Sequence, residues 1–140
     1  MKAEAHLKQQ IVRSRSFGSP VFDYDSLAQC ISLYVSSAAA KLREQGSQAG
    51  VVFVFIRTSP FKPDAPFYSN GLSVALAVPS SDTRDLLQAA LAGLKQIYQP
   101  NRAYAKAGVM LSQLQVARTA QHDLFSSAPS TLKSDTLMRA

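Results

Sequence analysis

The chain has 140 residues, of which 46% are hydrophobic, and its 15 Lys and Arg against 9 Asp and Glu give a net charge of +6. This length and composition predict one domain with a real core and exclude wholesale disorder. The longest apolar run, residues 51–56, is far shorter than the ~20 residues of a membrane-spanning helix. The polar first ten residues also lack the apolar segment of a secretory signal. Positive charge favours polyanionic ligands through counterion release, although it does not identify one.

Cys30 is the single cysteine, which excludes an internal disulfide framework. A lone thiol is typical of proteins in the reducing cytosol, so we expect a soluble, cytoplasmic protein. Cys30 stands at helical spacing from Leu27, Ile31 and Tyr34, which predicts a buried structural thiol rather than a nucleophile.

The apolar pattern divides the chain into a lead-in at residues 1–9, a folded domain at 10–115 and a flexible tail at 116–140. Residues 10–17 alternate as a β-strand does, and Gly18-Ser19-Pro20 predicts a break after them. The alternation predicts one face with Ile11, Arg13, Arg15 and Phe17, and an opposite face with Val12, Ser14 and Ser16.

A helix is predicted from about Asp25 to Gln45, where apolar residues recur every three or four positions. Asp25 or Ser26 can cap its first amides, and Gly46 permits it to end. The stripe that should face the core consists of Leu27, Ile31, Tyr34, Ala38 and Leu42.

The segment 51–58, VVFVFIRT, is rich in β-branched and aromatic residues and predicts a central strand. A loop with three prolines (Pro60, Pro63 and Pro66) follows. From Gly71 the alternation resumes as a strand that can pair with the first one as an antiparallel hairpin. The alternation predicts one face with Leu72, Val74, Leu76 and Val78, and an opposite face with Ser73, Ala75 and Ala77.

The cluster at 79–82 predicts the start of a second helix, which should run to about Tyr98 and end before Pro100. Its predicted core stripe is Leu87, Leu91, Leu94 and Tyr98. Residues 103–113 predict the last strand. The order β-α-β-β-α-β predicts an α+β fold, a two-layer sandwich of a four-stranded sheet with both helices on one face. The other face of the sheet would be open to solvent or a ligand.

Groups that could carry catalysis are few. The acidic residues are scattered, and His6 and His122 lie in the polar ends, where a metal or a catalytic base would lack partners. The six glycines are dispersed, so the sequence has no glycine-rich phosphate loop. We therefore expect no catalytic residue, metal site or cofactor in this chain.

Four segments resemble, in order, the C-terminal part of UmuC-type Y-family translesion DNA polymerases, the catalytic subunits of polymerase V and its plasmid relatives. They are KQQIVRSRSFGSPV at 8–21, VFIRTSPFKPDAPFYSN at 54–70, residues 82–87, and YAKAGVML at 104–111. The resemblance implies the little-finger domain, which has this order of elements and lies across the primer–template duplex. It also implies that the palm, with its Mg²⁺-binding carboxylates, belongs to a part of the parent polymerase that this sequence lacks. The implied role is non-catalytic DNA binding during translesion synthesis in the SOS response to DNA damage.

Candidate DNA contacts follow from the same resemblance, which implies phosphate contacts that hold a duplex without reading its sequence. The residues that match the family's first-strand segment are Arg13, Ser14, Arg15 and Ser16, and further candidates are Arg57, Lys62, Arg102 and Lys106. The alternative for Arg13 and Arg15 is that they are ordinary edge-strand charges that discourage aggregation.

The tail contains Gln121-His122-Asp123-Leu124-Phe125, which resembles the pentapeptide that binds the bacterial sliding clamp. Leu124 and Phe125 would fill an apolar pocket on the clamp, and Gln121 would orient the peptide through hydrogen bonds. His122 departs from the usual Leu, and the alternative is that Phe125 folds back on the domain. The family also implies contacts with a UmuD-type subunit and the recombinase filament, for which the sequence has no recognisable motif.

Two other functions fit the order of elements. An RNA-binding module of the RRM type would need aromatic residues on two central strands, whereas Phe53 and Phe55 share one strand and the last strand offers only Tyr104. A stand-alone interaction module could instead compete for the clamp or for polymerase partners. No membrane partner is expected.

Overall fold

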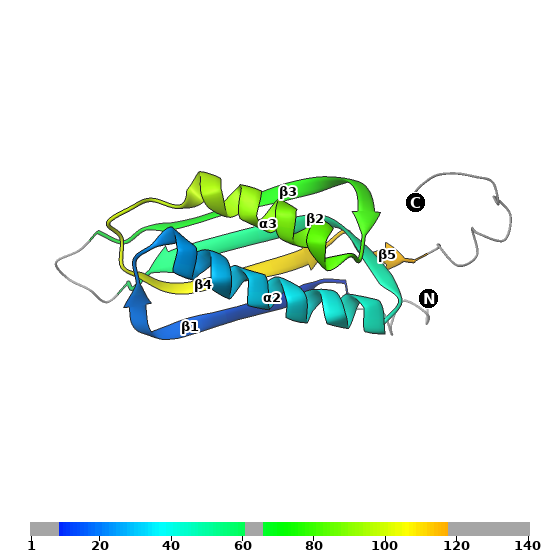
Figure 1. The fold of residues 1–140 in the computed structure, drawn as a ribbon, viewed down its shortest axis with the longest axis horizontal. Coiled ribbons are helices and arrows are strands. Elements are labelled where there is room, and N and C mark those ends of the chain that lie inside the picture. The colour runs from blue at the N-terminus through cyan, green and yellow to red at the C-terminus, as the bar shows by residue number, and fades with distance from the viewer. Residues whose placement is uncertain (1–8, 61–65, 118–140) are drawn as a thin grey trace, which may run out of the picture.

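The computed structural model describes residues 9–60 and 66–117. Helices α2 and α3 cover one face of an antiparallel sheet, and no helix of the described residues covers the other face (Figure 1). The predicted α+β sandwich and its βαββαβ order are confirmed, with one short strand more than the four expected. The elements are β1 (Ile11–Val21), α2 (Tyr24–Glu44), β2 (Ser47–Thr58), β3 (Ser69–Ser80), α3 (Thr83–Ile97), β4 (Tyr104–Ser112) and β5 (Gln115–Val116).

The strand order is β1-β4-β2-β3, so β2 and β4 are central and β1 and β3 form the two edges. Strands β2 and β3 form the predicted antiparallel hairpin, in which Val54 is paired with Leu72. The additional strand β5 pairs with the start of β2, where Ser47 is opposite Val116. No helix among the described residues is long and apolar enough to cross a membrane.

Helix α2 begins after Asp23, whose carboxylate accepts a hydrogen bond from the backbone N–H of Ser26 at 2.9 Å. This hydrogen bond lowers the pKa of Asp23 below its ordinary value.

The predicted apolar stripe of α2 is confirmed except at Tyr34, which lies half-buried at the flank of the helix. Cys30 is also only partly buried, which corrects its predicted position. The buried side chains of α2 are Leu27, Ile31, Val35, Ala38, Ala39 and Leu42.

Helix α3 is capped by Asp82, which accepts from the backbone N–H of Arg84 at 2.8 Å. Its predicted core stripe is confirmed in full only at Leu94: Leu87, Leu91 and Tyr98 are half-buried at the margin of the core, and Tyr98 follows the helix. Small residues bring the other side of the helix against the sheet, because a Cβ on Gly93 would lie 2.7 Å from Cγ1 of Val54. The residues actually buried are Leu86, Ala89, Ala90, Gly93, Leu94 and Ile97.

Two strands differ from the prediction because their register shifts. Strand β1 continues through the predicted break at residues 18–20 as far as Val21, with a register shift after Ser16. Pro20 is tolerated there because β1 is an edge strand. Val78 of β3 does not share the face of Leu72, Val74 and Leu76: it is 72% exposed, whereas those three pack against the core, since the β2–β3 register shifts between Ala49 and Val51.

The core lies between the helices and the inner side of the sheet, where Val52, Val54 and Ile56 of β2 are fully buried. Tyr104 is buried at one end of the sheet. Its hydroxyl donates a hydrogen bond to the carbonyl of Gln99 at 2.8 Å and accepts one from the N–H of Gln99 at 2.9 Å. Beside it, Tyr68 pairs with Thr58 through a backbone hydrogen bond of 2.8 Å. This pairing fixes the end of the β2–β3 hairpin.

Candidate nucleic-acid interface

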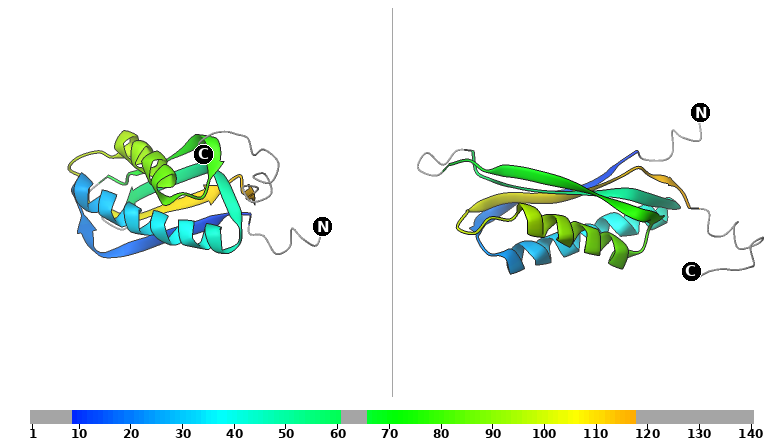
Figure 2. Two further views of the ribbon diagram at one scale, coloured as in Figure 1. Left: turned by 45° about the vertical axis from the view of Figure 1, so that its right-hand side comes forward. Right: turned by 90° about the horizontal axis from the view of Figure 1, so that it is seen from above.

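The sheet surface opposite α2 and α3 is named here the open face (Figure 2). Because Val52, Val54 and Ile56 point to the helices, the residues that alternate with them point away. Cross-strand partners share a face, so the register extends this assignment to β1, β3 and β4. The open face comprises Val12, Ser14, Ser16, Val51, Phe53, Phe55, Arg57, Ser69, Gly71, Ser73, Ala75, Lys106, Gly108, Met110 and Ser112.

Charge is segregated between the two layers of the domain. None of the five described strands contains an Asp or Glu. The acidic residues of the described chain cap or belong to the helices: Asp23, Asp25, Glu44, Asp82 and Asp85. The open face is therefore free of carboxylates within the described residues.

Two cations stand together on this face. Arg57 of β2 and Lys106 of β4 are directly opposite each other in the register. The ion pairs recorded for the described residues, Lys41–Glu44 and Arg84–Asp82, both lie in the helix layer. Like charges in opposite positions of a sheet are unfavourable, so this arrangement favours an anionic ligand that would lie between them.

Two phenylalanine rings occupy the centre of the open face. The rings of Phe53 and Phe55 have centroids 5.8 Å apart and an interplanar angle of 27°. A Cβ on Gly108 would lie 2.4 Å from Cζ of Phe55, and a Cβ on Gly71 would lie 2.4 Å from Cζ of Phe53. Each ring thus fills the space that a side chain of the neighbouring strand would take. Phe55 extends over β4 and Phe53 over β3, so both rings lie across the sheet.

The predicted run at residues 13–16 is divided between the two faces of β1. Ser14 pairs with Gly108 and Ser16 with Lys106, which places both hydroxyl residues on the open face. Arg13 lies on the helix-facing side, where its Nε donates to Oγ of Ser37 at 2.8 Å. Arg15 follows on that same side, at the groove between β1 and α2 that Tyr34 also lines.

Arg102 precedes β4, and its guanidinium lies 4.7 Å from the ring centroid of Tyr68. Its Nε and Nη2 donate to Oε1 of Gln99 at 3.1 and 2.9 Å, so this side chain has partners within the domain. The remaining candidates lie outside the described residues: Lys62, Gln121, Leu124 and Phe125.

Comparison with known proteins decides what kind of domain carries this face. Residues 8–124 match the family model described as the impB/mucB/samB family C-terminal domain. The chain belongs to this family. The protein UmuC of Salmonella typhimurium is 40% identical over 121 residues, which are 86% of this chain and 29% of that protein. MucB of Escherichia coli is 43% identical over 131 residues, 94% of this chain and 31% of that protein.

The impB/mucB/samB-type domain thus spans less than a third of the length of these curated relatives. Among solved structures, the insertion ternary complex of Dbh DNA polymerase matches with a TM-score of 0.56 and 13% identity, over 76% of this chain and 29% of that chain. At this identity the likeness shows the fold alone. The resemblance to the C-terminal domain of UmuC-type Y-family polymerases is confirmed.

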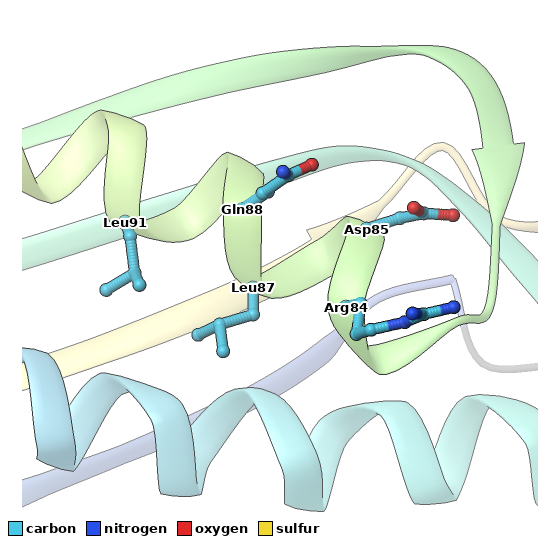
Figure 3. Close-up of a pocket in the computed structure, with 5 residues that line it drawn as sticks. All are labelled: Arg84, Asp85, Leu87, Gln88 and Leu91. Carbon is cyan, nitrogen blue, oxygen red and sulfur yellow. The ribbon is translucent and has the colours of Figure 1, made fainter.

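Two grooves are lined by residues of the described ranges. The one between β1 and α2 includes Ser16 of the open face at its rim. The other, of about 440 Å³, runs along α3 and is lined by Arg84, Asp85, Leu87, Gln88 and Leu91 (Figure 3). Leu87 and Leu91 point toward α2 there, which accounts for their incomplete burial. The carboxylate of Asp85 in this groove accepts a hydrogen bond from Oγ of Ser80 at 2.7 Å.

Within the described residues, no three His, Cys, Asp or Glu side chains are grouped to hold a metal ion.

The relation of the two phenylalanines to Gly71 and Gly108 is not predicted from the sequence. The Phe-x-Phe pattern of a strand was a visible signal, but the glycines are identified only by the register across β3 and β4. The second central strand brings no aromatic residue to the open face: it presents Lys106, Gly108 and Met110, while Tyr104 is buried.

Proposed function

We propose that this domain is the non-catalytic DNA-binding part of an error-prone translesion polymerase of the UmuC type, acting in SOS mutagenesis, and that its open face holds the primer–template duplex. The single observation that carries the proposal is the placement of Arg57 opposite Lys106 on a sheet without carboxylates. Membership of the impB/mucB/samB family supports a role in a polymerase. Catalysis and its Mg²⁺ are assigned to the other two thirds of the parent protein.

The binding is electrostatic and independent of base sequence. Arg57 and Lys106 contact phosphates, and the hydroxyls of Ser14 and Ser16 add hydrogen bonds to the same backbone. Arg13 and Arg15 raise the positive potential at the β1 edge, and Arg102 does so beside Tyr68 at the end of the β2–β3 hairpin. Lys62, which lies outside the described residues, is a further proposed contact. Contacts of this kind suit an enzyme that must accept a damaged template, because they read no base edges.

The test is a titration of a labelled duplex with the wild-type domain and the double variant R57S/K106S between about 50 and 200 mM salt. Each lost phosphate contact should reduce the slope of log K against log salt by about 0.9. The matched control is R84S/K95S, which removes the same charge from α3. Equal slopes for R57S/K106S and wild type, or equal losses in the two double variants, would contradict a duplex site on the open face.

We further propose that residues 121–125 dock on the bacterial sliding clamp, with Leu124 and Phe125 as apolar anchors and Gln121 as the orienting group. The variant L124A/F125A should lose clamp binding in a pull-down or surface-resonance assay. The matched control is L132A/L137A, which removes two other leucines from the same tail. Retained binding of L124A/F125A would show that this pentapeptide is not the anchor.

The alternative of a stand-alone interaction module predicts a different pattern. Such a module would bind the clamp, a UmuD-type subunit or the recombinase filament although the wild-type domain shows no affinity for the duplex. Parallel measurements with duplex and clamp on the same variants separate these functions.

A further inference from the structure

We propose that the rings of Phe53 and Phe55 form a stacking surface for unpaired nucleobases, so that the open face also takes single-stranded DNA. This inference rests on the proposed function, because Arg57 and Lys106 are the cations that would hold the phosphates of that strand. It goes beyond the proposed function because it assigns unpaired nucleobases as the ligand of Phe53 and Phe55 at the centre of the open face.

The position of the rings supports this role. Phe53 and Phe55 are only partly buried, and they lie on the side of the sheet that neither helix covers. They therefore make no contribution to the core between the sheet and the helices. Large apolar side chains gathered on one exposed surface mark an interaction site.

The glycines keep the surface low and flat. Because Gly71 and Gly108 lack a Cβ, the rings settle over β3 and β4 instead of projecting from the sheet. Ser73 is the β3 neighbour opposite Phe53, and Ser14 stands beside Gly108 on β1. Side chains this small leave the outer faces of the rings accessible to a planar group.

Arg57 and Lys106 lie close enough to Phe55 to contact the phosphate of a nucleotide whose base stacks on that ring. Arg57 follows Phe55 by two residues on the same face of β2, a separation of about 7 Å along a strand. Lys106 stands opposite Arg57 and two residues before Gly108. A base stacked on Phe55 would therefore have its phosphate within reach of two positive side chains. Stacking on aromatic rings beside a positive groove is the general way in which proteins bind single strands without reading their sequence.

The test compares three ligands of equal length: a duplex, a single strand of thymidylate, and a single strand of abasic sites. The variants are F53L and F55L, which keep an apolar side chain and remove the aromatic face. Each should weaken binding of the thymidylate strand by about 10-fold. Duplex binding and abasic-strand binding should stay within about 2-fold of wild type, since neither offers an unpaired base. L33M, an apolar substitution at an exposed position of α2 in the helix layer, is the matched control and should change none of the three.

A second readout is independent of affinity. The chain contains no tryptophan, so F53W introduces a single indole into the proposed stacking surface. Its fluorescence should be quenched by the thymidylate strand and not by the abasic strand.

The outcomes separate this inference from the proposed function. Unchanged thymidylate binding in F53L and F55L, or an equal loss for all three ligands, would overturn the stacking surface without contradicting the proposal that the open face binds a duplex. Failure of the wild-type domain to bind any of the ligands would overturn both. Loss of duplex binding in R57S/K106S together with a selective loss of thymidylate binding in F55L would support both.

Discussion

Arg57 of β2 and Lys106 of β4 face each other across the two central strands, with both side chains on the helix-free side of the sheet. Directly opposed like charges oppose strand pairing by roughly 0.2–1 kcal/mol. The described part of the chain offers them no ion-pair partner. The repulsion between Arg57 and Lys106 therefore lowers the free energy of unfolding of the domain.

The first prediction is that K106S makes the domain more stable while it binds duplex less tightly. Removing one of two opposed cations should raise the free energy of unfolding by roughly 0.2–1 kcal/mol at low salt. The gain should shrink at high salt, where the repulsion is screened. Urea denaturation at the two salt concentrations measures it. K95S in the last turn of α3 should show the opposite sign, because a cation there interacts favourably with the helix dipole. A loss of stability in K106S would show that Arg57 and Lys106 do not repel each other.

The second prediction concerns the glycine under Phe55. An added methyl in G108A would meet Cζ of Phe55 at 2.4 Å and Cβ of Ser14 at 2.5 Å, so both strand neighbours must shift. We expect a loss of about 1–3 kcal/mol in the free energy of unfolding, measured by chemical denaturation. G71A is the matched control and should cost less, because its two shortest contacts are with the free end of the Phe53 ring, which can rotate away, and its third, with Cβ of Phe55, is longer at 3.3 Å.

The Phe55 contact itself is tested in the variant F55A. With the ring removed, the further substitution G108A should cost less than it does in the wild-type domain. An equal cost in both backgrounds would show that the ring does not occupy the space above Gly108.

Periodicity made most of the fold predictable. Leu27, Ile31, Ala38 and Leu42 mark the inner side of α2 by their spacing, and the alternation in 51–58 identifies the central strand β2. On α3 the same spacing predicts a core stripe with Leu87 and Leu91, but these two side chains are only half-buried at its margin. The sheet instead packs against Ala90 and Gly93, since small residues permit the closest approach.

The open face was less predictable, because it depends on which strands become neighbours. Nothing local in the sequence shows that β4 inserts between β1 and β2, and this insertion alone sets Arg57 against Lys106 and Phe55 against Gly108. Alternation correctly separated Ser14 and Ser16 from Arg13 and Arg15. It could not tell which of the two sets would lie on the helix side.

The third prediction is that Y104F loses stability although it keeps the aromatic ring. The hydroxyl of Tyr104 donates to the carbonyl and accepts from the N–H of Gln99, and both bonds vanish with it. At about 0.5–1.5 kcal/mol for each hydrogen bond, the free energy of unfolding should fall by roughly 1–3 kcal/mol. Thermal and urea denaturation measure this change. The control is Y24F, since the Tyr24 hydroxyl makes no recorded hydrogen bond within the described residues. Equal stability of Y104F and wild type would mean that water replaces both bonds at no cost.

The fourth prediction is a loss of stability in alkaline solution that depends on two tyrosines. Burial raises the pKa of Tyr104 above its ordinary value of 10.0, and burial together with the neighbouring Cys30 raises the pKa of Tyr34. Below pH 10 both residues are neutral in the folded and the unfolded chain, so their contribution to stability is fully present. As the pH rises above 10, the unfolded chain loses these protons first, and stability falls until the folded-state pKa values are passed.

Urea denaturation at a series of pH values from about 9 upward should therefore show a steeper decline for the wild-type domain than for Y104F, and the shallowest decline for Y34F/Y104F. Only the slopes are compared, because Y104F starts from a lower stability. The same slope in all three proteins would contradict the inference that burial keeps these two phenols protonated.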